Sequence, residues 1–290
     1  MEWIRLMKLI TFLYNGRERV GVIGKGGNVT PLASESLNAM LEEKGWREDA
    51  EEKAGSAGTI PFSAVKLLAP IPVPRQDIIC LGINYMEHAE ESARYKKEAF
   101  GGERPFAVYF SKRVNRAVED GGYIESHSDL ADSLDYECEL AVVIGKECRN
   151  VAKEEVREYI LGYTILNDVS AREIQTRHKQ WYFGKSMDGF TPMGPWIVTA
   201  DEFSFPPKLA IQSYVNGELR QDSNTEKLIF GIDHVISELS AGMTLKAGTV
   251  IATGTPAGAG MGFVPPRFLK PGDVVSCKIE GIGTLTNTVR

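Results

Sequence analysis

The sequence predicts an α+β fold in which strands predominate, and two observations support this. Short apolar or alternating segments of strand length, several bounded by Gly, Pro or Asn-Gly, outnumber the segments with helical spacing. These segments do not alternate regularly with helices, as they would in a doubly wound parallel sheet. With 290 residues, 43% of them hydrophobic and 25% charged, the chain is also long enough to bury a full core.

The N-terminal region has the pattern of a small αβ unit. Residues 8–31 alternate apolar and polar positions around an Asn-Gly turn, which predicts a hairpin and a further short strand. Residues 34–44 place Leu and Met at helical spacing before a Gly, which predicts a helix. A charged, small-residue segment at 47–58 reads as a connection to the extended, Pro-rich segment at 67–75. Such a segment is typical of a domain boundary.

We therefore predict a small N-terminal domain at residues 1–70 and a larger, β-rich catalytic domain at residues 71–290. Within the larger domain, we expect strands at 77–83, 107–110, 136–144 and 163–167, a helix at 153–161 capped by Gly162, a helix begun by Ser170 with Glu173 completing a capping box, and a strand-rich tail at 248–289.

Composition excludes several classes of partner. The net charge of −6 and the absence of a basic patch argue against nucleic acid. No apolar stretch approaches the ~20 residues that span a bilayer, and the N-terminal apolar run is too short for a signal peptide. The four cysteines form no Cys-x-x-Cys pair, which indicates free thiols. We expect a cytoplasmic protein with no membrane partner.

Three carboxylates indicate a metal site. Glu137 and Glu139 lie two residues apart in a predicted strand, so both side chains point to the same face. Two like charges buried together need a cation or several hydrogen bonds to compensate them, whereas a solvated edge strand would need neither. Asp168 ends another predicted strand, where it could instead cap the helix that follows. Together the three offer the oxygen ligands that Mg²⁺ or Mn²⁺ prefers.

Further residues could carry out catalysis. His88 and Glu91 share a face if their segment is helical, and a carboxylate beside an imidazole is the pairing that a general base requires. Lys185 lies among aromatic and small residues, where it could stabilise an oxyanion or simply lie at the rim of a core. The loop at 254–260 offers backbone N–H groups and the Thr255 hydroxyl to an anion.

In order along the chain, the motifs GINYMEHAEE, DYECELAVVIG, GYTILNDVSAREIQ, FGKSMDGFTPMGPW and TGTPAGAGMG resemble the fumarylacetoacetate hydrolase family. The resemblance covers roughly residues 68–290 and is strongest to the short branch that contains acylpyruvases and oxaloacetate decarboxylases. It implies a mixed β-sandwich roll, a homodimer, and Mg²⁺ or Mn²⁺ in the site.

The resemblance also implies residue roles. Glu137, Glu139 and Asp168 match the metal ligands of the family, His88 and Glu91 its proton-transferring dyad, Lys185 its oxyanion lysine, and Gln175 and Thr255 its substrate-binding positions. Larger members take a further Asp ligand from the segment before the dyad. Glu87 stands near that position, and we leave it out of the ligand set.

The function implied by the resemblance is metal-dependent cleavage of a C–C bond in a small 2-oxo or 2,4-dioxo acid, of the acylpyruvate hydrolysis type. Oxaloacetate decarboxylation and isomerisation of the 2-hydroxyhepta-2,4-diene-1,7-dioate type stay open, because all three reactions use the same electrophilic centre. A sensor that binds a dicarboxylate through a metal is the non-enzymatic alternative. The His88–Glu91 pair favours an enzyme, because a sensor needs no general base.

Overall fold

The computed structural model describes residues 7–24, 26–102 and 105–290, and its largest element is a ten-stranded sheet. The strand order is β3-β2-β1-β12-β10-β9-β15-β5-β6, and β4 pairs with β1. The bounds are β1 Lys8–Tyr14, β2 Arg17–Ile23, β3 Val29–Pro31, β4 Lys66–Leu68, β5 Ile78–Gly82, β6 Val108–Lys112, β9 Cys138–Ile144, β10 Ile160–Asn167, β12 Met193–Thr199 and β15 Val250–Ala252.

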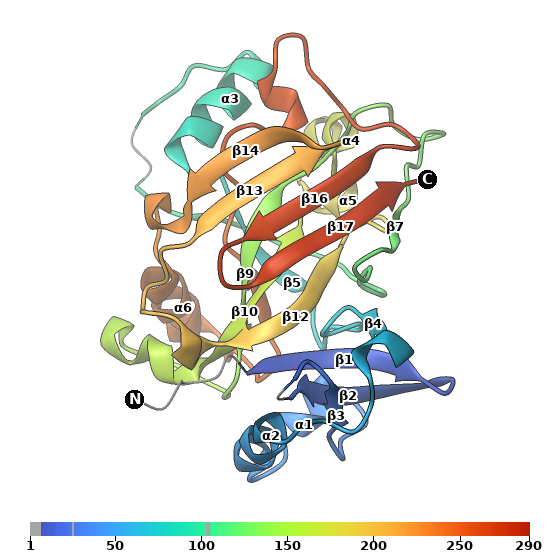
Figure 1. The fold of residues 1–290 in the computed structure, drawn as a ribbon. Coiled ribbons are helices and arrows are strands. Elements are labelled where there is room, and N and C mark those ends of the chain that lie inside the picture. The colour runs from blue at the N-terminus through green and yellow to red at the C-terminus, as the bar shows by residue number, and fades with distance from the viewer. Residues whose placement is uncertain (1–6, 25, 103–104) are drawn as a thin grey trace.

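A second, five-stranded sheet lies over the central part of the first (Figure 1). Its order is β14-β13-β16-β17-β7, and its strands are β14 Glu218–Asn224, β13 Ala210–Val215, β16 Val274–Ile279, β17 Gly283–Val289 and β7 Tyr123–Ile124. A small pair joins β8 Leu134–Asp135 to β11 Ser170–Ala171. The strand-dominated, mixed fold predicted from the sequence is confirmed.

Helices are short and lie around the sheets. They are α1 Leu37–Met40, α2 Trp46–Gly55, α3 Met86–Lys96, α4 Arg172–Arg177, α5 Tyr182–Lys185 and α6 Ile232–Gly242. Single 3₁₀ turns are η1 Phe62–Ala64, η3 Ala200–Glu202, η4 Thr225–Lys227 and η5 Gly260–Gly262, and η2 Lys153–Tyr159 is longer. In Figure 1, α3 lies at the far end of the molecule from α1 and α2. Within the described residues, no helix has the length and hydropathy to cross a membrane.

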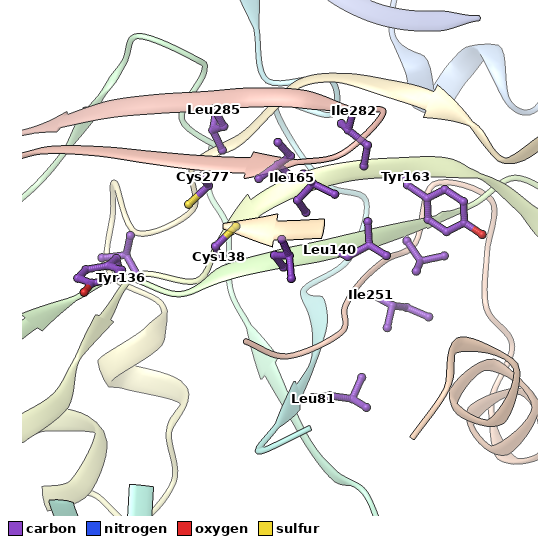
Figure 2. Packing of buried hydrophobic residues seen from close by; sticks show 14 of the residues in the cluster. Leu81, Tyr136, Cys138, Leu140, Tyr163, Ile165, Ile251, Cys277, Ile282 and Leu285 are labelled. Carbon is purple, nitrogen blue, oxygen red and sulfur yellow. The ribbon is translucent and has the colours of Figure 1, made fainter. Parts of the chain in front are cut away.

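The core explains why β9 reads as an unbroken apolar run. Leu140 and Val142 face the cluster between the two sheets, which includes Ile165, Cys277 and Leu285 (Figure 2). Ala141 and Val143 face a second cluster on the opposite side of the large sheet. A strand covered on both faces needs no polar alternation. The four cysteines are free and buried, as expected from their spacing.

The N-terminal strands continue the large sheet instead of forming one of their own. The hairpin of β1 and β2 turns at Asn15, as predicted, and β1 pairs antiparallel with β12, aligning Lys8 with Val198 and Leu9 with Ile197. The division into domains at residue 70 stays a prediction.

Local predictions were wrong in three segments, residues 47–58, 153–162 and 170–173. The charged segment at 47–58 is mostly helical, because α2 needs only a small buried face and is stabilised by Lys53–Asp49 and Arg47–Glu51 pairs. The predicted helix at 153–161 is the 3₁₀ helix η2, after which β10 starts.

Gly162 lies inside β10 and caps no helix. A Cβ atom there would come within 2.1 Å of the Val198 carbonyl oxygen, so close strand packing explains the glycine.

The helix predicted to begin at Ser170 begins at Arg172. The Ser170 hydroxyl donates to the Asp168 carbonyl oxygen, so no capping box forms. Ser133 supplies the missing acceptor, since its Oγ accepts from the Glu173 N–H at 2.9 Å. This partner comes from a distant part of the chain, which sequence spacing could not reveal.

Candidate metal centre and active site

Two paired strands bring the three predicted carboxylates together. Glu139 lies in β9 opposite Leu166 of β10, Glu137 precedes β9, and Asp168 follows β10. The Asp168 N–H donates to the Glu137 carbonyl oxygen at 2.8 Å and fixes the two strand ends to each other. Each residue offers a carboxylate oxygen, and these oxygens all lie within 4.8 Å of one another.

Burial excludes both alternatives raised by the sequence. Glu137, Glu139 and Asp168 are 4%, 1% and 0% exposed, so the glutamates do not form a solvated edge. The Asp168 side chain caps no helix, since α4 begins only at Arg172. Both carboxylate oxygens of Asp168 instead accept hydrogen bonds from lysines. Three buried carboxylates require compensation from positive charge.

The chain itself compensates Glu137. Lys185 Nζ donates to Glu137 Oε2 at 2.5 Å, and Arg172 Nη2 lies 2.6 Å from Glu137 Oε1. Burial alone would raise the pKa of Glu137, but the charges of Arg172 and Lys185 outweigh it and hold the pKa well below the usual range. Glu137 is therefore an anion at neutral pH.

Asp168 lies between two lysines. Lys185 Nζ donates to Asp168 Oδ2 at 2.6 Å, and Lys112 Nζ donates to Asp168 Oδ1 at 2.7 Å. Lys112 is fully buried at the end of β6, and this burial lowers its pKa although the Asp168 charge opposes the change. Lys112 was not predicted as a site residue, because a single lysine at the end of a short apolar segment carries no signal of its partner.

Glu139 has much weaker compensation. Its Oε2 accepts one hydrogen bond, from the Gly254 N–H at 2.8 Å. Burial, followed by repulsion from Asp168 and Glu137, raises the pKa of Glu139 well above the usual value. A divalent cation among the three carboxylates would remove that repulsion, and the all-oxygen donor set fits Mg²⁺ or Mn²⁺. The residues therefore fit the metal that the sequence predicts.

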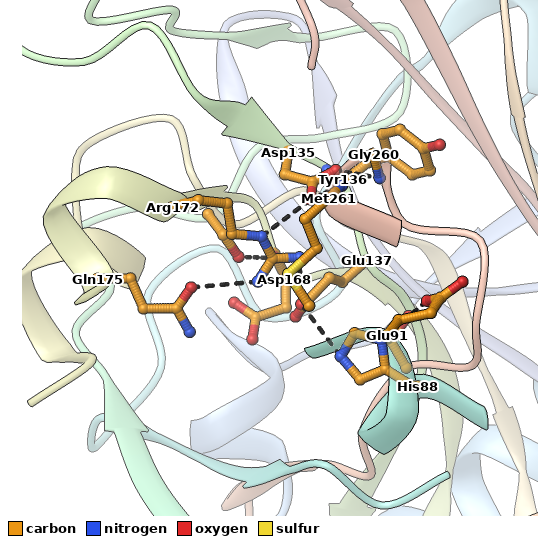
Figure 3. Close-up of polar contacts among 12 residues, drawn as sticks. His88, Glu91, Asp135, Tyr136, Glu137, Asp168, Arg172, Gln175, Gly260 and Met261 are labelled. Atoms are coloured by element: carbon orange, nitrogen blue, oxygen red, sulfur yellow. Dashed lines mark hydrogen bonds and ion pairs between the residues drawn. The ribbon is translucent and has the colours of Figure 1, made fainter. Parts of the chain in front are cut away.

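The predicted dyad lies beside these carboxylates. His88 and Glu91 occupy successive turns of α3, and His88 Nδ1 lies 3.5 Å from Glu91 Oε2. On its other side His88 Nε2 lies 3.9 Å from Glu137 Oε1 (Figure 3). The Glu91 carboxylate accepts the Gly258 N–H at 3.0 and 3.1 Å. The 254–260 loop thus positions the acid that faces the imidazole, which the sequence did not indicate.

A single pocket collects the remaining predicted residues. Its lining includes His88, Glu137, Glu139, Gln175, Lys185 and Thr255, with aromatic side chains of Tyr95, Phe110 and Trp181. Gln175 Oε1 accepts from Arg172 Nη1 at 3.1 Å. The Thr255 hydroxyl donates to the Cys138 carbonyl oxygen and accepts from Gln221 Nε2, so it braces the loop against β9.

Glu87 lies apart from the pocket. It is exposed on the first turn of α3, and its Oε1 lies 3.2 Å from Lys227 Nζ. Its omission from the ligand set agrees with this position.

Arg172 and Asp135 are two further site residues that were not predicted. Arg172 connects three side chains of the site, those of Asp135, Glu137 and Gln175 (Figure 3). The spacing of Arg172 and Gln175 at i and i+3 was the available signal, since such residues share a helix face. Asp135 offered a weaker one, as another carboxylate two residues before Glu137.

The triad is a buried set of carboxylates on or next to the paired strands β9 and β10, and the His–Glu pair of α3 lies beside it. This arrangement is a candidate metal-dependent active site. The sequence profile described as fumarylacetoacetate (FAA) hydrolase C-terminal matches residues 77–290. This chain belongs to the fumarylacetoacetate hydrolase family.

Similar proteins include enzymes of more than one activity. The oxaloacetate tautomerase YisK of Bacillus subtilis is 45% identical over 244 residues, which are 84% of this chain and 79% of that protein. A fumarylacetoacetate hydrolase structure from Exiguobacterium antarcticum is 39% identical, covers 98% of this chain and 99% of its own, and has a TM-score of 0.79. A 2-hydroxyhepta-2,4-diene-1,7-dioate isomerase structure from Mycobacterium marinum is 32% identical, with 98% of both chains covered and a TM-score of 0.75.

Proposed function

We propose that this chain is a divalent-cation-dependent enzyme that transfers a proton at the carbon next to the 2-oxo group of a small dicarboxylic acid. Enol–keto conversion of oxaloacetate is the representative reaction. The observation that carries the proposal is the position of His88, between a carboxylate partner and the carboxylate triad, in one pocket. The 45% identity to an oxaloacetate tautomerase supports it.

Glu137, Glu139 and Asp168 would hold the cation. When bound, Mg²⁺ or Mn²⁺ would polarise the 2-oxo group and stabilise the negative charge that develops there. The Lys185 ammonium, close to two of these carboxylates, adds positive charge at the same place.

His88 is the proposed general base. If its Nδ1–H faces Glu91, the carboxylate fixes the ring orientation and raises the basicity of Nε2. Nε2 is the nitrogen on the Glu137 side, so a substrate held at the triad would present its C3 proton to that atom. In the reverse direction the imidazolium would return the proton to C3.

Arg172 and Gln175 are proposed to orient the substrate. The Gln175 amide oxygen accepts from Arg172, so its NH₂ is the group turned to a ligand oxygen. A carboxylate near Arg172 and Lys185 would lie in positive surroundings, which suits a dianionic acid.

Hydrolysis of an acylpyruvate is the second candidate. The 39% identity to a fumarylacetoacetate hydrolase favours it. The same His88 would deprotonate a water that attacks the distal carbonyl, while Lys185 would stabilise the oxyanion. Oxaloacetate decarboxylation would use the same electrophilic site without this water. We also propose a homodimer, which light scattering of the purified chain would test.

The decisive assay follows freshly dissolved enol oxaloacetate by near-ultraviolet absorbance and proton NMR, with Mg²⁺ or with a chelator. We expect Mg²⁺-dependent conversion to the keto form without release of CO₂. Pyruvate and CO₂ would instead show a decarboxylase. Cleavage of acetylpyruvate, without enol conversion, would show a hydrolase.

His88→Ala separates the dyad from the metal centre. Loss of the general base should slow turnover by about 10² to 10⁴-fold, whereas Mn²⁺ affinity measured by calorimetry should stay close to that of the unmodified chain. Near-normal turnover of the variant would show that His88 is not the base.

A further inference from the structure

Asp135 is a fully buried carboxylate with an unusually complete set of donors. Its Oδ1 accepts the N–H groups of Gly260 at 2.6 Å and Tyr136 at 2.9 Å. Its Oδ2 accepts the Met261 N–H at 3.0 Å and Arg172 Nε at 2.9 Å (Figure 3). Four donors, one of them charged, account for the burial of its charge. They also come from three separate parts of the chain.

One of these parts is Arg172, which connects Asp135 to the carboxylate triad and to the proposed substrate-binding residue Gln175. By holding Nε, Asp135 fixes the plane of the Arg172 guanidinium. The other two nitrogens of that group then face Glu137 Oε1 at 2.6 Å and Gln175 Oε1 at 3.1 Å. The rigid fork of arginine makes these three contacts geometrically dependent on one another.

A second part is the 3₁₀ turn η5, which connects Asp135 to the His88–Glu91 dyad. Gly260 and Met261 belong to η5, which follows the loop whose Gly258 N–H donates to Glu91. The Gly262 carbonyl oxygen accepts from Arg94 of α3 at 3.0 Å. Packing is tight on both sides of η5: a Cβ atom on Gly260 would lie 2.6 Å from Asp135 Oδ1, and one on Gly262 would lie 2.5 Å from the Glu91 carboxyl group.

We infer that Asp135 is a positioning residue that sets the distance between the His88–Glu91 dyad and the Arg172–Glu137 side of the site. It contacts no proposed reacting atom and acts through Arg172 on one side and through η5 and Glu91 on the other. The inference rests on the proposed function and adds to it a residue that neither the motifs nor the dyad itself assigns.

Asp135→Asn tests this role with almost no change in volume. An amide has one acceptor oxygen and would turn its NH₂ toward two donors that now face a carboxylate oxygen. We expect kcat for enol conversion to fall by about 100-fold, since a 1 Å misplacement can have that effect. We expect the Mn²⁺ dissociation constant to change by less than about fivefold, because the three carboxylates of the triad are retained.

A double-mutant cycle with Glu91→Gln separates positioning from general loss of structure. If Asp135 acts through Glu91, the doubly substituted chain should lose about as much kcat/KM as the more damaging single variant. Losses that multiply would overturn the inference, as would a folded Asp135→Asn chain with unchanged kcat.

A matched control is available in Asp273. It is also buried and accepts hydrogen bonds from Asn216 Nδ2 at 2.8 Å and the Lys270 N–H at 2.9 Å, but it belongs to a turn of the second sheet. Asp273→Asn should lower the melting temperature and leave kcat unchanged.

A spectroscopic readout makes the test independent of turnover. The chain has four histidines, so ¹⁵N-histidine NMR can assign the His88 ring nitrogens by comparison with His88→Ala. Asp135→Asn should shift these resonances and Asp273→Asn should not. If Asp135→Asn does not fold, Gly260→Ala, which crowds the same carboxylate, should shift them too. Unchanged His88 resonances in Asp135→Asn would refute the inference even if oxaloacetate is not the substrate. If these resonances shift but the unmodified chain has no activity on oxaloacetate, the proposed function alone is refuted.

Discussion

Glu137 and Glu139 lie two residues apart and are both buried in the carboxylate triad, yet their electrostatic surroundings are opposite. Glu137 meets Arg172 and Lys185, and its pKa is held below the usual range. Glu139 meets one backbone N–H and two carboxylates, and its pKa is raised. The chain thus compensates Glu137 fully, whereas the Lys185 charge and the Gly254 N–H offset only part of the repulsion at Glu139.

The difference indicates where a cation from outside the chain would stabilise the site most. The anionic form of Glu137 is already stabilised in the metal-free protein by Arg172 and Lys185, which hold its carboxylate in place. The anionic form of Glu139 would be stabilised by further positive charge. The repulsion around Glu139 is therefore free energy that metal binding can recover, at a cost to the stability of the metal-free chain.

The largest expected effect is on stability, and its sign should differ between the two glutamates. Glu137→Gln leaves two buried cations with fewer partners and should destabilise the metal-free chain by about 3 to 5 kcal/mol. Glu139→Gln removes a repelled carboxyl group and keeps an acceptor for Gly254, so it should raise the free energy of unfolding. Urea denaturation in a chelator gives both values. A loss of similar size in both variants would contradict the comparison.

The pH dependence of stability should also separate the two residues. The contribution of Glu139 is fully present below the pKa of an unfolded glutamate, about 4.3, and is lost as pH rises toward the raised pKa of the folded state. The contribution of Glu137 is present above that value and is lost as pH falls toward its lowered folded pKa.

Unfolding free energies of the metal-free chain and its two Gln variants, measured from about pH 4 to pH 8, test this directly. The advantage of Glu139→Gln over the unmodified chain should grow with pH. The deficit of Glu137→Gln should shrink toward low pH. Parallel curves for all three chains would show that neither glutamate titrates as described.

The smallest effect is expected outside the cluster. Glu87 is near Glu91 in sequence, but it forms an exposed pair with Lys227. Glu87→Gln should change stability by less than about 1 kcal/mol and leave Mn²⁺ affinity unchanged. A clear loss of affinity would add Glu87 to the ligand set and weaken the contrast between the two glutamates.

Local rules explain what the sequence could predict. Strand alternation places Glu137 and Glu139 on one side, and the end of the next strand supplies Asp168, so short-range patterns suffice for the triad. The helical spacing of His88 and Glu91 likewise predicted their contact. These residues act through neighbours that are close in the chain or on the adjacent strand.

The residues that compensate the carboxylates depend on tertiary packing. Lys112 reaches Asp168 across 56 positions and Arg172 reaches Asp135 across 37, and no periodicity links such pairs. The 3₁₀ form of η2 was not predicted for another reason, since residues three apart share a face in both helix types. Prediction was therefore better for the three carboxylates than for the cationic residues that contact them.

Calorimetric titration of Mn²⁺ into the metal-free chain, in two buffers of different ionisation enthalpy, tests whether the three carboxylates bind a cation through Glu139. We expect one cation per chain with net release of protons, because a bound cation would oppose the rise in the pKa of Glu139. We also expect no detectable binding to Glu139→Gln. Absence of binding to the unmodified chain, or equal binding to the variant, would show that the triad is not a cation site that depends on Glu139.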